Sequence, residues 1–127
     1  MNVLVDGRTF TKKSAGISTF LKCSLQEWAN KSPQNNFWVF VPKKKDETIS
    51  FSCFPANVHF INIQFYGFIP NLFLLLLCIP YYIRKYKIDL YYSPVPCIPY
   101  FLPKQVKKLI VVHDVVNIAY KDTMQLR

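Results

Sequence analysis

Five short apolar runs, separated by polar or helical segments, constrain the fold of this chain most strongly. They span residues 2–6, 37–41, 58–63, 88–92 and 107–113. Each has the length of a strand, and most are nearly continuous in apolar residues instead of alternating, which is typical of strands covered on both faces. With helical segments between some of the runs, the pattern predicts an α/β fold: a Rossmann-like parallel sheet with flanking helices.

The segment 16–30, between the first two runs, has a helical rhythm. Its apolar residues recur at spacings of three and four and form one face: Ile17, Phe20, Leu21, Leu25 and Trp28. Ser14 stands where a helix N-cap is expected. The segment therefore predicts an amphipathic helix.

Residues 65–83 form an uncharged run of 19 residues that includes four consecutive leucines. That length just suffices for a membrane span, but Pro70 and Pro80 bracket only nine residues, and three tyrosines add hydroxyls. Arg84-Lys85-Tyr86-Lys87 follows directly. Three alternatives stay open: a buried crossover helix, a helix lying on a membrane surface with its basic end on lipid headgroups, and a true span.

The chain is strongly basic. Its 16 Lys and Arg outnumber 7 Asp and Glu, which gives a net charge of +9. Such a surplus predicts attraction to nucleic acid, anionic lipid or a phosphorylated substrate, and a simple bias in composition is the competing explanation.

The four cysteines are Cys23, Cys53, Cys78 and Cys97, and no two of them form a CxxC pair. Their spacing indicates neither a zinc site nor a redox centre. Because no signal peptide is apparent at Met1, we expect reduced, mostly buried thiols in a cytoplasmic chain.

Polar residues follow three of the expected strands. Asp6 and Arg8 come after the first, Ser93 after the fourth, and His113 and Asp114 after the fifth. In parallel sheets ligands bind at the carboxyl ends of the strands. These residues are therefore the candidates for a site.

Three motifs resemble glycosyltransferase family 4. Val3-Leu4-Val5-Asp6-Gly7-Arg8, followed by Ala15-Gly16-Ile17-Ser18-Thr19-Phe20, is similar to the opening strand, Asp-Ala-Arg turn and Gly-Gly-Ile-Gly-Arg-Tyr helix start of that family. Asp89-Leu90-Tyr91-Tyr92-Ser93-Pro94 resembles Asp-Leu-Val-His-Ser-Pro, and Val111-Val112-His113-Asp114-Val115 resembles Val-His-Asp-Leu. The motifs stand in family order and together cover the chain.

The resemblance implies roles for individual residues. Gly16 and Ile17 would meet the pyrophosphate of a sugar-nucleotide donor at a helix N-terminus. His113 and Asp114 would position the transferred sugar and stabilise charge without acting as covalent nucleophiles. Asp6, Arg8 and Ser93 would lie on the acceptor side. The chain departs from the family at Ala15, Ser18 and Tyr92, which replace two glycines and a histidine.

The resemblance also implies a domain organisation. Residues 1–127 would form the acceptor-side, N-terminal domain of a retaining GT-B enzyme, incomplete at its C-terminal end and without the donor-binding domain. The isolated chain would then be inactive. The expected partners are a nucleotide-sugar, a glycan or lipid-linked acceptor, an anionic membrane contacted peripherally at its inner face, and a second chain carrying the donor domain.

The sequence contains none of the motifs that are typical of several other enzyme classes. There is no Asp-x-Asp, no Walker A loop, no Gly-x-Gly-x-x-Gly and no Gly-x-Ser-x-Gly. We therefore expect no metal and no cofactor besides the nucleotide-sugar substrate, and no nucleic-acid partner. The alternative from another class is a basic protein that binds a membrane surface or nucleic acid without catalysis.

Overall fold

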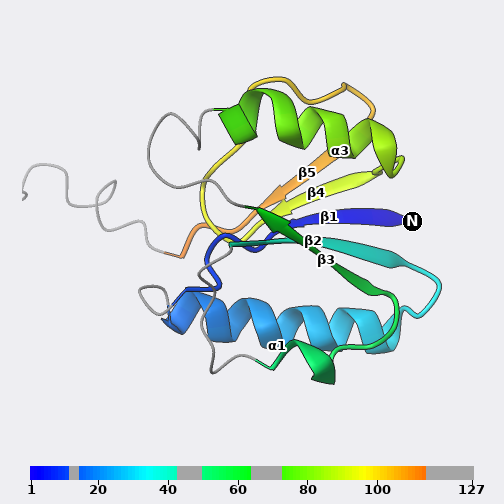
Figure 1. The fold of residues 1–127 in the computed structure, drawn as a ribbon, viewed down its shortest axis with the longest axis vertical. Helices are drawn as coiled ribbons and strands as arrows, with labels where there is room; N and C mark the ends of the chain where they lie inside the picture. Colours follow the sequence, from blue (N-terminus) through cyan, green and yellow to red (C-terminus); the bar gives the residue numbers. More distant parts are fainter. Residues whose placement is uncertain (12–14, 43–49, 64–72, 114–127) are drawn as a thin grey trace, which may run out of the picture.

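Five parallel strands form one sheet with helices on both faces (Figure 1). The computed structural model describes residues 1–11, 15–42, 50–63 and 73–113. The strands are β1 (Asn2–Asp6), β2 (Asn36–Pro42), β3 (Val58–Ile63), β4 (Leu90–Ser93) and β5 (Lys107–Ile110), arranged in the order β3-β2-β1-β4-β5. The predicted α/β, Rossmann-like fold is confirmed.

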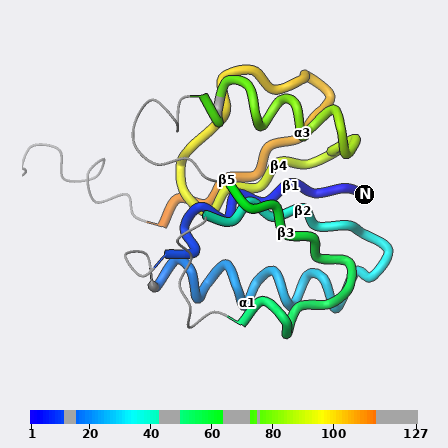
Figure 2. Tube along the Cα trace, viewed as in Figure 1, coloured from blue at the N-terminus to red at the C-terminus, as the bar shows by residue number. Residues whose placement is uncertain are grey.

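The two faces of the sheet are covered by different helices (Figures 1 and 2). α1 (Ala15–Lys31) lies on one face, where it packs on the side chains of Val3, Val5 and Val39. The π-helical turn η3 (Leu74–Cys78) and the helix α3 (Ile79–Lys85) cover the other, where they pack on Leu4 and Phe40. A short 3-10 turn, η2 (Phe51–Cys53), precedes β3. Successive residues of a strand point to opposite faces, so β1 contributes to both cores.

The predicted helix between β1 and β2 is confirmed, but its buried face differs in detail. Leu21, Leu25 and Ala29 are buried, whereas Phe20 is 42% exposed. Ser18 takes a buried place because its hydroxyl donates a hydrogen bond to the Thr9 carbonyl. Ser14, the expected N-cap, lies outside the described residues.

The uncharged run at 65–83 is described from Phe73 onward. η3 and α3 bury Leu74, Ile79 and Ile83 against the sheet. Pro80 lies in the first turn of α3 instead of ending the helix, and the π turn directly precedes it. Proline lacks the N–H that would continue the regular ladder, and a π turn is one way to pass such a gap. Within the described parts of the chain, no helix is long and apolar enough to cross a membrane.

β4 and β5 differ from their predicted bounds. β4 begins two residues later than expected, because the Ile88 N–H bonds to the Ile83 carbonyl instead of joining the ladder. β5 ends at Ile110, not at His113, and Leu109 and Val112, expected in the core, are about half exposed. The reason is position: among the described strands, β5 lies at the edge of the sheet and pairs with β4 on one side.

All four cysteines are free, as expected, but they are not mostly buried. Cys23 and Cys53 are exposed, and Cys78 and Cys97 are partly exposed. Cys23 lies on the outer side of α1, and the Cys53 thiol donates to the Ser50 carbonyl at the surface. The expectation of burial was wrong because these thiols stand in a surface helix, a surface turn and a loop, not in strands.

Candidate functional site

The carboxyl ends of β1 and β4 form the point at which the sheet changes direction. From β1 the chain goes on to β2 on one side, and from β4 it goes on to β5 on the other. In open α/β sheets the crevice at such a point is the usual place for a ligand. Asp6 and Ser93 end these two strands.

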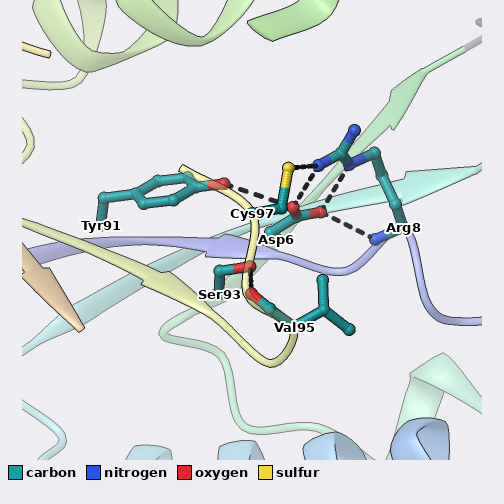
Figure 3. A network of polar contacts seen from close by, with 6 residues as sticks. All are labelled: Asp6, Arg8, Tyr91, Ser93, Val95 and Cys97. Carbon is teal, nitrogen blue, oxygen red and sulfur yellow. Dashed lines mark hydrogen bonds and ion pairs between the residues drawn. The ribbon is translucent and has the colours of Figure 1, made fainter. Parts of the chain in front are cut away.

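Asp6 is the centre of a polar cluster at this edge (Figure 3). The Arg8 guanidinium donates two hydrogen bonds to the Asp6 carboxylate, from Nε to Oδ1 at 2.9 Å and from Nη2 to Oδ2 at 2.6 Å. The two residues thus form a bidentate ion pair. The Tyr91 hydroxyl donates to Oδ2 at 3.2 Å, and Arg8 Nη2 lies 3.4 Å from the Cys97 sulfur. We call Asp6, Arg8, Tyr91 and Cys97 the Asp6 cluster. It ties the loop after β1 to β4 and to the proline-rich loop that follows β4.

The protonation of the cluster follows from its burial. Burial by itself would lower the pKa of Arg8, but the hydrogen bonds and negative charge of Asp6 outweigh it and raise that pKa above its usual value. Burial raises the pKa of Tyr91 far above its usual value, and the Asp6 charge raises it further. Arg8 therefore stays charged and Tyr91 stays a neutral hydrogen-bond donor across the physiological range.

Ser93 lies beside this cluster but faces inward. It is fully buried, and its hydroxyl donates to the Val95 carbonyl at 2.7 Å. That bond fixes the turn after β4. The predicted acceptor-side residue thus holds a loop, and in this conformation its hydroxyl does not reach solvent.

Gly7 allows the loop after β1 to pass close to β2. A Cβ on this residue would lie 2.2 Å from the Phe40 carbonyl oxygen, so no other side chain fits without moving the backbone. The Ser18 bond to the Thr9 carbonyl then ties the same loop to α1. The sequence signal for Gly7 was its place directly after a buried strand.

Gly16 and His113 form a second group, which is open to solvent. A Cβ on Gly16 would meet nothing within 4 Å. Phe20 stands one helical turn further along α1, and its ring meets the His113 imidazole edge-on, with 5.2 Å between centroids. Both Gly16 and His113 are exposed. The structure thus brings His113 beside the first turns of α1, while Ile17 is half-buried there. Asp114 lies outside the described residues.

Two members of the Asp6 cluster had no signal in the sequence, and neither did one buried hydroxyl. Tyr91 and Cys97 join the Asp6 cluster from 85 and 89 residues away in sequence. The Tyr92 hydroxyl, on the opposite face, is buried and has no hydrogen-bond partner within the described part of the chain. No group of three His, Cys, Asp or Glu side chains suited to a metal forms among the described residues.

A groove of about 340 Å³ opens near the other ends of the strands. Apolar residues from α1 and four strands line most of it: Val3, Trp28, Phe37, Leu90, Tyr92 and Leu109. None of the residues predicted for a site lines this groove. It is the uncovered part of the α1 face, next to the edge strand β5.

Comparison with protein-family models, with curated proteins and with solved structures finds no match for this chain.

Proposed function

We propose that this chain is the acceptor-side, Rossmann-like domain of a retaining GT-B glycosyltransferase. The observation that carries the proposal is the position of His113. His113, which follows the fifth strand, lies edge-on against the ring of Phe20 on α1, four residues after the exposed Gly16, at the carboxyl edge of a parallel sheet. This is the edge at which open α/β sheets bind ligands.

The chemistry of this edge suits a donor diphosphate. α1 has 17 residues, and its first turn presents backbone N–H groups and the positive end of the helix dipole. The missing side chain at Gly16 lets a phosphate approach, and Ile17 contributes its backbone. His113, with Asp114 next in sequence, would contact the sugar and stabilise charge without forming a covalent bond.

The Asp6 cluster would form the acceptor side of the same edge. The Asp6 carboxylate is engaged in the ion pair with Arg8, but about a fifth of the Arg8 side chain is exposed and the guanidinium stays charged. It can meet an acidic or hydroxylated acceptor as a preoriented donor. Ser93 would act on the acceptor indirectly, through the loop that it holds.

Transfer would require a second domain, because catalysis needs donor and acceptor held in register. We propose that another domain or a partner chain holds the base and ribose of the nucleotide, that this chain contacts the diphosphate at the start of α1, and that these 127 residues alone have negligible transferase activity. A lipid-linked acceptor and a peripheral position at the inner membrane face would fit the net charge of +9. No metal enters this scheme.

The test is binding, not turnover. UDP, GDP and their sugar conjugates are titrated into ¹⁵N-labelled chain, and we expect chemical-shift changes that cluster at Gly16, Ile17 and His113. Gly16→Asp should weaken binding by about tenfold, because it adds a negative charge where the diphosphate would lie. Asn30→Asp adds the same charge at the far end of α1 and should leave binding unchanged. If no nucleotide shifts these residues, or if the two variants behave alike, the donor site is not here.

A function without catalysis is the alternative: a basic protein that binds a membrane surface or nucleic acid. It is favoured by exposed aromatic residues that lie away from the sheet edge. The titration separates the two functions, since a protein of the second kind has no reason to bind a nucleotide diphosphate at α1.

A further inference from the structure

The helix formed by η3 and α3 is apolar on its outer side as well as on its inner side. Leu74, Ile79 and Ile83 face the sheet and are buried. Leu77 and Tyr81, four residues apart on the same side of the helix, are each more than half exposed. A helix that is hydrophobic all round is normally covered on all sides. Within the described parts of the chain, no segment buries the outer side of this helix at Leu77 and Tyr81.

The loop of residues 94–106 adds to that outer side. It passes over the helix (Figure 2), and Leu102 and Val106 anchor it by packing against the same core as Ile79 and Ile83. Three of its apolar side chains point to solvent: Ile98, Tyr100 and Phe101, the last two about 70% exposed. We call Leu77, Tyr81, Ile98, Tyr100 and Phe101 the outer apolar surface.

Positive charge borders this surface. Residues 73–88 and 94–106 contain no Asp or Glu, and their four charged side chains are all basic and exposed: Arg84, Lys85, Lys87 and Lys104. The Lys85 ammonium lies 5.8 Å from the centre of the Tyr81 ring and 5.3 Å from that of Tyr86. It therefore lies at the margin of these aromatic side chains, within range of a cation–π interaction.

We propose that the outer apolar surface inserts into the interface of an anionic lipid bilayer, with the basic residues on the headgroups. Apolar side chains that enter the acyl boundary, tyrosines at headgroup level and a basic margin are what such an interface binds. A second copy of the chain is a poorer occupant, because the basic margins of two such surfaces would repel each other. Nucleic acid is poorer too, since Leu77 and Ile98 offer it neither stacking nor hydrogen bonds.

This inference does not depend on the transferase proposal. The full chain is mixed with vesicles of phosphatidylcholine alone or with about a third phosphatidylserine, and flotation measures the bound fraction at low and high salt. We expect binding to the anionic vesicles at low salt, weaker binding at high salt, and little binding to neutral vesicles.

Two pairs of variants identify the surface. Tyr100→Ser with Phe101→Ser should weaken binding by about tenfold or more, because less apolar area enters the lipid. The matched control is Leu109→Ser, which removes a half-exposed apolar side chain on β5. Arg84→Gln with Lys85→Gln should weaken binding roughly fivefold for each charge removed. Its control, Lys31→Gln with Lys107→Gln, removes the same charge from α1 and β5.

Three results would overturn the proposal. One is no flotation with anionic vesicles at low salt. Another is equal loss from the surface variants and their controls, which would mean general attraction by the net charge. The third is association with another partner: the wild-type chain is dimeric in solution, or single-stranded RNA displaces it from the vesicles. If the Tyr100→Ser and Phe101→Ser variant abolishes that association, the surface binds a second copy of the chain or nucleic acid instead of lipid.

Discussion

The Asp6 cluster and the Gly16–His113 group lie at the same edge of the sheet, yet they are built in opposite ways. In the cluster, the carboxylate accepts hydrogen bonds from a guanidinium and a phenol, and almost none of it reaches solvent. In the second group, a glycine has open space where a side chain would be, and an exposed imidazole meets the edge of an aromatic ring.

Residues with similar positions in the sequence therefore have different surroundings in the structure. Asp6 and His113 both stand at the ends of predicted strands, and both belong to motifs that resemble one family. Only one of them is available to a ligand. A polar residue at a strand end is thus either a clamp for the local loops or a candidate contact, and its partners decide which it is.

The two glycines give the largest expected difference between the groups. Gly7→Ala should cost about 3 kcal/mol or more of unfolding free energy, because its Cβ would lie 2.2 Å from a backbone carbonyl oxygen that cannot easily move. Gly16→Ala should instead be neutral or should stabilise by up to ~1 kcal/mol, since helical alanine loses less backbone entropy. Urea unfolding of both variants measures this. Equal loss of stability would mean that the start of α1 is as tightly enclosed as the loop after β1.

Removing the carboxylate of the cluster should have the next largest effect. Asp6→Ala should cost about 2 kcal/mol, below the usual range for a broken buried pair, because Arg8 can still reach water. The control is Glu27→Ala, which breaks an ion pair of similar type to Lys31 on the surface of α1 and should cost less than ~0.5 kcal/mol. Thermal unfolding of the two variants decides whether the cluster is a clamp. Matching melting temperatures would rule that out.

The smallest expected effect compares two neighbouring tyrosines. Tyr91→Phe should cost about 1.5 kcal/mol, because it removes a buried hydrogen bond to a charged carboxylate. Tyr92→Phe removes a buried hydroxyl that has no partner within the described residues, and it should leave stability unchanged or raise it slightly. The difference in unfolding free energy between the two variants is the measurement. A reversed order would show that the Tyr91 hydroxyl contributes nothing to the cluster.

The strand pattern could be predicted from local sequence because burial on both faces leaves runs such as Val3 to Val5 without polar residues. Exposure was harder to predict. Phe20 looks like a core residue by spacing, but its place on α1 is opposite the end of β5, where it meets His113. Leu109 looks like core by composition, but its strand lies at an edge.

The Asp6 cluster could not be predicted as a whole. Asp6 and Arg8 are close in sequence, and their pairing could be guessed, but Tyr91 and Cys97 reach them only because β1 and β4 are neighbours in the sheet. Strand order is a property of the whole chain. No local pattern around Tyr91 distinguishes its hydroxyl, which has a partner, from that of Tyr92.

The central place of β1 has a consequence for synthesis. β1 lies between β2 and β4, and the Asn2 N–H bonds to a carboxylate that is made 87 residues later. At ~5–20 residues per second, the ribosome takes roughly 4 to 17 seconds to bridge that gap. Once β2 is made, β1 can pair with it on one side, but its other edge keeps unpaired backbone N–H and C=O groups until β4 arrives. The central strand is therefore an exposed edge strand for part of synthesis, when it can pair with other chains.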